Sequence, residues 1–189
     1  MAFAKSLHTP KLYDLIRGAQ RVSDITSFRY PTAVRRHYER LLNFPDGFLV
    51  LGDAIASFNP IYGQGMSVAA LQVQALQQIL AERAAEAHGL AGLAPSFFPV
   101  AAGIADNAWI LAADQDLVFP QTQGERPPDL KQRLAYFAAV VSLTADDPAI
   151  HRLMIEVLNL CKPLSVLNDE PLRSRVLGEQ RKHPEKYNF

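Results

Sequence analysis

Residues 52–71 combine an acidic side chain with a glycine-flanked helix start. Asp53 comes just after an apolar run, and Gly63 and Gly65 follow ten and twelve residues later. An ionised carboxylate only accepts hydrogen bonds, so it suits the hydroxyls of a sugar or polyol. Glycines let a backbone approach a flat ligand closely, and a helix start there would stabilise an anion by about 0.3 to 2 kcal/mol. These residues predict one site for a polyol-bearing, flat ligand.

The same residues also have simpler interpretations. A Gly-Asp pair after a strand is often a turn in which the carboxylate caps the backbone. The glycines are not a dinucleotide fingerprint, because Val68 stands where G-x-G-x-x-G requires its third glycine, and no complete fingerprint occurs in the chain.

The elements around Asp53 are expected to be strands. Residues 48–51 are four apolar residues between a turn and Gly52, which is typical of a strand buried on both faces of a parallel sheet. Open α/β sheets bind ligands at the carboxyl ends of such strands. Residues 25–30 are the other strand that the sequence predicts, and helices are expected over 5–22 and 32–42.

The rest of the chain is expected to be helical. The helix after Gly65 is apolar on nearly every side and is predicted to be largely buried. Residues 88–96 contain Gly and Pro and form the predicted connector. Further helices are expected over 97–118, 130–143, from Asp147-Pro148 to about 160–163, and from 168–171 to 181.

The full arrangement resembles a known cofactor motif. Gly52-Asp53-Ala54, Pro60 and Gly63-Gln64-Gly65-Met66, followed by a small-residue helix, are similar to the second FAD-binding motif of aromatic-hydroxylase-type flavoprotein monooxygenases. The similarity is strong over residues 45–80 and weaker back to 25. It implies the C-terminal part of an FAD-binding Rossmann-type α/β domain in residues 1–87, followed by a mostly α-helical region in residues 88–189.

The resemblance also implies roles for residues. Asp53 would bind the ribityl chain of FAD, while Pro60 and the backbone from Gly63 through Gln64 and Gly65 to Met66 would line the isoalloxazine. Gly52 belongs to the same motif. The implied activity is a monooxygenase that uses NAD(P)H and O2 on a small organic substrate. Flavin-dependent reductases and halogenases share the motif and stay open as alternatives.

The sequence departs from the family in two respects. Ile55, Ala56 and Ser57 stand where many members carry a histidine, so a histidine-dependent variation is not supported. The glycine-rich segment that holds the ADP part of FAD is absent. We therefore expect that an N-terminal FAD-binding half completes the site, in cis or in trans, and that this chain alone binds FAD weakly or not at all. A truncated, non-catalytic helical interaction module is the alternative.

Composition sets further limits. The 189 residues carry 19 basic and 19 acidic side chains, so no net field favours nucleic acid. No segment approaches the roughly 20 uninterrupted apolar residues of a membrane span, and a cytoplasmic protein is expected. The histidines and the single cysteine show no metal-ligand spacing, so no metal site is predicted.

Two further sets of residues lie outside the motif. Aromatic side chains in the helical region could line a substrate pocket, although at helical spacing they are more often core: Phe97, Phe98, Trp109, Phe119, Tyr136 and Phe137. Asp106, Asp114 and Asp116 share one predicted helix and are expected to be solvated or to cap it.

Overall fold

The computed structural model describes residues 1–86 and 89–189. It is mainly helical, with about 59% of residues in helices and one two-stranded sheet in the described part. The expected α/β remnant of a Rossmann-type domain is therefore wrong. The predicted boundary between residues 87 and 88 lies outside the described residues and stays a prediction.

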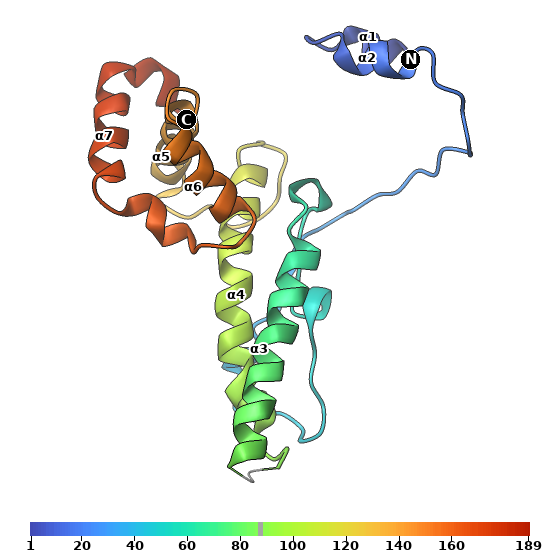
Figure 1. Ribbon diagram of the computed structural model, residues 1–189, viewed down its shortest axis with the longest axis vertical. Helices are drawn as coiled ribbons and strands as arrows, with labels where there is room; N and C mark the ends of the chain where they lie inside the picture. Colours follow the sequence, from blue (N-terminus) through green and yellow to red (C-terminus); the bar gives the residue numbers. More distant parts are fainter. Residues whose placement is uncertain (87–88) are drawn as a thin grey trace.

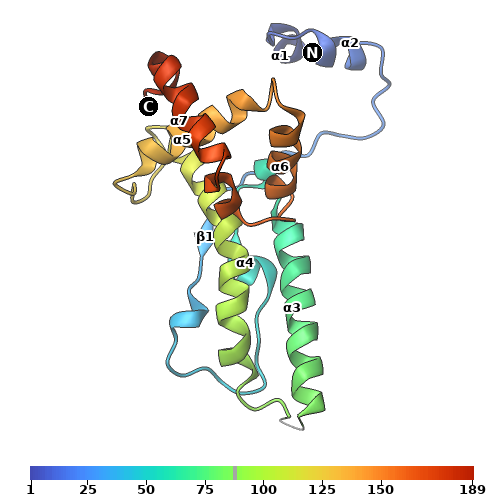
Figure 2. The same cartoon turned by 60° about the vertical axis from the view of Figure 1, so that its left-hand side comes forward.

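Two long helices form the centre of the molecule. Helix α3 (Gly65–Ala85) and helix α4 (Leu93–Asp116) lie side by side and antiparallel, joined by a short connection (Figures 1 and 2). Alanines on α4 let the two helices approach, and Ala101, Ala105 and Ala108 are fully buried. Together with Val68, Phe97 and Phe98 they form the first hydrophobic core.

The C-terminal helices form a second cluster at the end of α4 (Figure 1). It comprises α5 (Leu130–Leu143), α6 (Pro148–Leu158), the 3-10 helix η4 (Leu164–Asn168) and α7 (Leu172–Lys182). A 3-10 turn, η5 (Pro184–Tyr187), ends the chain. Val140, Val157 and Val176 are at the centre of a separate core here. The helices predicted for this region are confirmed to within a few residues.

The only sheet in the described residues pairs β1 (Val34–Arg35) with β2 (Ala56–Ser57), antiparallel. Arg35 has a nearly buried side chain and donates to Asp106 of α4 at 3.0 Å, which fixes the sheet on that helix. The helix predicted over 32–42 is wrong, because this segment forms strand β1 and the 3-10 helix η1 (Tyr38–Arg40). Pairing with β2 outweighs the local helical pattern.

The predicted buried strand at residues 48–51 is wrong, although Leu51 has extended backbone angles. A strand buried on both faces needs a neighbour on each side, and the described chain provides none. Leu49, Val50 and Leu51 instead pack half-buried against the first core. Residues 25–30 also form no strand, and Ile25 and Phe28 are largely exposed.

The N-terminal helices lie apart from the rest of the molecule. Instead of one helix over 5–22, the chain forms α1 (Ala2–Ser6) and α2 (Lys11–Ile16), with Pro10 between them as the residue that precedes α2. Proline lacks the N–H that a continuous helix requires, which explains the break. An extended segment links α2 to β1 (Figures 1 and 2).

Helix α3 is not largely buried, which corrects another expectation. Among its side chains only Val68 and Gln72 are buried, while Met66, Val73 and Leu80 are 86%, 51% and 36% exposed. One side of α3 packs on α4 and on residues 52–54, and the described chain does not cover the side with Met66 and Val73.

Within the described residues, one helix is long and apolar enough to cross a membrane by length and composition. It is α4, and core helices outside membranes pass the same test. Its buried alanines and phenylalanines belong to the first core.

Candidate functional site

The structure brings Asp53 next to the start of α3. Asp53 lies in the 3-10 turn η2 (Gly52–Ala54), and Gly65 is the first residue of α3. A Cβ atom placed on Gly65 would be 3.7 Å from Oδ1 of Asp53. The absence of a side chain at position 65 therefore leaves the carboxylate uncovered beside the first turn of the helix.

The helix start beside Asp53 is open to the surface. Gln64 at the N-cap position makes no capping hydrogen bond, so no side-chain cap of α3 is present among the described residues. Asp53 and Gly63 are exposed, and Met66 is 86% exposed. Uncapped N–H groups at a helix start carry partial positive charge and bind acceptors or anions. The exposed side of this turn thus offers donors, and Asp53 offers an acceptor.

A second 3-10 turn leads the chain into α3. In η3 (Pro60–Tyr62), Pro60 is exposed, and the backbone N–H of Ile61 donates to Oδ1 of Asn59 at 3.2 Å. Gly63 ends this turn with φ of 69°, in the left-handed region. Glycine adopts that conformation without strain, which explains why this residue type stands here.

Gly52 has a structural role, because it is buried and does not lie on the exposed surface beside Asp53. It is buried at φ of 57°, and its N–H donates to Oε1 of Gln72 at 2.8 Å. The Gln72 amide donates in turn to the carbonyl of Ala101 at 3.3 Å. A Cβ on Gly52 would be 3.3 Å from Cβ of Ala69, closer than most such contacts. These bonds hold η2 against α3 and α4, and so set the position of Asp53.

Gln64 also faces the interior. It is 6% exposed, and its Nε2 donates to the carbonyl of Leu158 at 3.0 Å, which joins the start of α3 to the end of α6. Its Oε1 is buried and has no hydrogen-bond partner in the described part of the chain. Gln64 and Tyr62 border a mainly apolar hollow of about 510 Å³ between η3 and helices α4 to α6.

Asp116, at the end of α4, holds the loop of residues 59–62 through hydrogen bonds. Its Oδ1 accepts from Nδ2 of Asn59 and from the hydroxyl of Tyr62, each at 2.9 Å. Burial of the phenol, helped by the hydrogen bond to Asp116, raises the pKa of Tyr62 to about 12. The sequence alone predicts that Asp116 is solvated or caps the helix. The acceptor role was missed because Asn59 and Tyr62 lie more than fifty positions away.

A larger cavity, of about 1050 Å³, lies beyond this network. Asn59, Asp116 and Trp109 line it, together with Phe119 and Tyr30. The hydroxyls of Tyr30 and Ser57 share a hydrogen bond at its edge. Of the aromatic residues considered from the sequence, Trp109 and Phe119 thus border a cavity, whereas Phe97 and Phe98 are core.

The described residues contain no group of three or more His, Cys, Asp or Glu side chains that could hold a metal ion. Cys161 is exposed.

Comparison with known proteins adds one relative. No protein-family model matches the chain. Protein Rv3254 from Mycobacterium tuberculosis (strain ATCC 25618 / H37Rv) is 26% identical to it over 178 residues. The match covers 94% of this chain but 37% of the relative. The chain thus spans little more than a third of the length of the curated relative that it matches, and the relative's name describes no activity.

Proposed function

We propose that this chain forms one wall of an FAD site in a flavin-dependent oxidoreductase, most simply a monooxygenase that uses NAD(P)H and O2. The observation that carries the proposal is the convergence of the Asp53 carboxylate and the uncapped start of α3 across Gly65. Asp53 and Gly65 are twelve positions apart in the sequence, and the packing of η2 on α3 through Gln72 brings them together.

The exposed residues fit the chemistry of a flavin. Asp53 accepts hydrogen bonds and would bind ribityl hydroxyls. Gly63 and Gly65 have no side chains and Gln64 faces inward, so the backbone between Pro60 and Met66 is accessible to a flat ring. The N–H groups at the start of α3 would stabilise the negative charge of a reduced ring, by about 0.3 to 2 kcal/mol.

FAD, when bound, would supply the redox chemistry, accepting hydride from NAD(P)H and activating O2. The residues of this chain would then position and polarise.

A second polypeptide segment would complete the site. Asp53 is exposed and lines neither of the two cavities described above, so its side chain lies on an open surface. Met66 and Val73 leave apolar surface of α3 exposed beside it. We propose that an N-terminal FAD-binding half, in cis or in trans, covers this surface and brings the glycine-rich turn for the ADP part.

A non-catalytic interaction module is the second candidate. The exposed apolar side chains of α3, and of Ile25 and Phe28 before β1, would serve a protein contact without any cofactor. In that case Asp53 would have no ligand, and only apolar residues would matter for partner binding.

A titration of the chain with FAD, followed by flavin fluorescence, tests the proposal. We expect weak, saturable binding that Asp53→Ala reduces about tenfold or more, because a hydrogen bond to a charged group contributes about 1.5 to 3 kcal/mol. Asp146→Ala, which removes an exposed carboxylate elsewhere, is the matched control and should leave the affinity unchanged. Equal affinities for all three proteins would contradict the FAD site. Tight one-to-one binding by this chain alone would contradict the need for a second segment.

A further inference from the structure

The apolar hollow between η3 and helices α4 to α6 has the size of a small-molecule site. Its volume is about 510 Å³, and such sites range over about 300 to 1,000 Å³. Phe137 of α5 and Met154 of α6 line it, together with Tyr62. Aromatic rings and a methionine sulfur make favourable contacts with flat aromatic molecules. The walls therefore favour a flat ring as the ligand.

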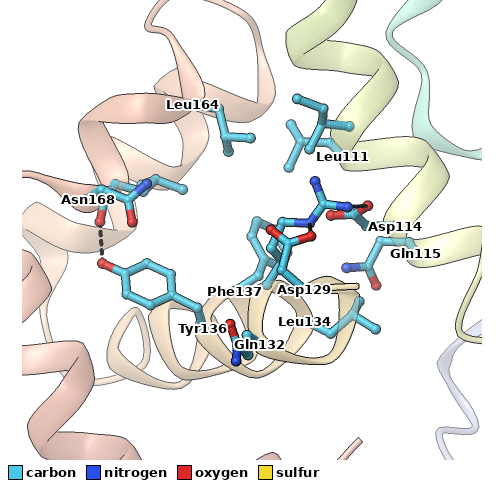
Figure 3. Close-up of a pocket in the computed structure, with 13 residues that line it drawn as sticks. Leu111, Asp114, Gln115, Asp129, Gln132, Leu134, Tyr136, Phe137, Leu164 and Asn168 are labelled. Atoms are coloured by element: carbon cyan, nitrogen blue, oxygen red, sulfur yellow. Dashed lines mark hydrogen bonds and ion pairs between the residues drawn. The ribbon is translucent and has the colours of Figure 1, made fainter. Parts of the chain in front are cut away.

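Some of the side chains that line this hollow border a second cavity as well. Figure 3 shows Leu111 and Gln115 on α4 and Phe137 on α5, beside a cavity of about 280 Å³ that these side chains also line. With a cavity on each side, they are less tightly packed than an ordinary protein core. These side chains can therefore adjust when a ligand enters the hollow.

Gln64 is a buried polar side chain of the hollow, and it lacks one hydrogen bond. It is 6% exposed, and its Nε2 donates to the carbonyl of Leu158 at 3.0 Å. A carbonyl only accepts hydrogen bonds, so this contact fixes which end of the Gln64 amide is the oxygen. Oε1 of Gln64 has no partner among the described residues. A buried acceptor without a donor is destabilising, so a ligand that supplies the donor is favoured.

The hydroxyl groups that line the hollow do not supply this donor. The hydroxyl of Tyr62 donates to Oδ1 of Asp116 at 2.9 Å, and that of Thr144 donates to the carbonyl of Val141 at 2.7 Å. Each hydroxyl has a single proton, so both oxygens can only accept further hydrogen bonds. Among the described residues that line the hollow there is no carboxylate, lysine or arginine. A charged ligand would find no opposite charge there, which favours a neutral one.

Apolar side chains of the hollow are still exposed to solvent. Ile61, Val141 and Ile155 line it and are 79%, 46% and 47% exposed. A ligand that covers these side chains removes apolar surface from water, which stabilises the complex.

We propose that this hollow binds a flat, neutral, mainly apolar molecule of about two fused rings, and that an N–H or O–H group of the ligand donates to Oε1 of Gln64. The proposal goes beyond the FAD site and does not rest on it. Binding in the hollow needs no cofactor, and Asp53 does not line it.

Indole and benzofuran test the proposal, because they have nearly the same shape, but indole has an N–H donor where benzofuran has an oxygen. Binding to the 189-residue chain, without FAD, is followed by amide NMR. We expect both compounds to shift signals of residues that line the hollow, and indole to bind about three- to tenfold more tightly. The side-chain amide signal of Gln64 should shift further with indole than with benzofuran.

Gln64→Met keeps a side chain of similar size and removes Oε1, so it should make the affinities for indole and benzofuran equal. Val141→Phe fills part of the hollow and should weaken both compounds about threefold or more. Val73→Phe is the matched control, because Val73 is 51% exposed on α3 and does not line the hollow, and it should change neither affinity.

The exposed position of Val141 allows its substitution even if Gln64→Met does not fold. Equal affinities of the wild-type chain for indole and benzofuran would overturn the proposal. Shifts in residues that do not line the hollow, or failure of both compounds to bind, would overturn it as well.

Discussion

Gln72 shows how a single polar side chain positions the candidate site. It is fully buried and links the N–H of Gly52 to the carbonyl of Ala101, so it joins η2, α3 and α4. In the sequence it only interrupts an apolar run. Its function as a bridge depends on groups twenty and twenty-nine positions away, which no local pattern reveals.

Gln72→Ala should lower the free energy of unfolding by about 1 to 3 kcal/mol, because it leaves two buried backbone groups unsatisfied. Urea unfolding followed by circular dichroism measures the change. Gln74→Ala is the control, since Gln74 is exposed on the same helix and should matter little. Equal effects of the two substitutions would contradict the bridging role.

Tyr62 makes the stability of the folded protein depend on pH. Its pKa is raised to about 12, so the folded protein holds the phenolic proton more tightly than the unfolded chain, whose tyrosines titrate near 10. The stability that this hydrogen bond contributes is therefore complete below about pH 10 and is lost as the pH rises towards 12.

The difference in stability between the wild-type chain and Tyr62→Phe should accordingly shrink above about pH 10. Unfolding at a series of pH values, together with tyrosinate absorbance, provides the measurement. A Tyr62 hydroxyl with the ordinary tyrosine pKa would show that the phenol is neither buried nor held by Asp116.

At the level of elements, the same substitution to alanine should have different effects at Gly63 and at Gly65. Gly63 is left-handed, so Gly63→Ala should lower the free energy of unfolding by about 1 to 2 kcal/mol. Gly65 begins α3 without a positive φ, and a Cβ there meets only the Asp53 carboxylate at 3.7 Å. Gly65→Ala should leave stability almost unchanged but weaken FAD binding, because the methyl group covers that carboxylate.

Thermal unfolding and FAD titration of the two variants separate these effects. If Gly65→Ala bound FAD as the wild-type chain does, the gap between Asp53 and α3 would not be the binding place.

The sequence predicted the C-terminal elements well because their signals are local. Leu130–Leu143 matches its predicted helix, and Asp147 caps α6 as expected, accepting from the N–H groups of Ala149 and Ile150. The strands predicted at 25–30 and 48–51 failed for the opposite reason. Apolar runs of that kind form strands only beside partners, and the described chain has none for them.

The candidate site was predictable in part. Residue types, their spacing and the resemblance to a flavoprotein motif indicated that Asp53 and the turn before α3 would meet, and the structure places Asp53 beside Gly65. The inward roles of Gly52 and Gln64 were not predictable, because they depend on Gln72 and on Leu158 at the end of α6.

At the scale of the whole molecule, one face of α3 packs on α4, and the face that carries Val73 is exposed in the described chain. Val68→Ala removes a fully buried side chain and should cost about 2 kcal/mol of unfolding free energy. Val73→Lys, on the exposed face, should change it by no more than about 0.5 kcal/mol. Chemical denaturation of both variants tests this contrast, and strong destabilisation by Val73→Lys would show that the chain itself already buries that face.

The most direct test of the account is to map where FAD contacts the isotope-labelled chain by amide NMR. FAD should shift the signals of Asp53, Gly63, Gly65 and Met66, and Asp53→Ala should abolish these shifts. Shifts confined to α5, α6 and α7, or no shifts at the start of α3 at high FAD concentration, would contradict it.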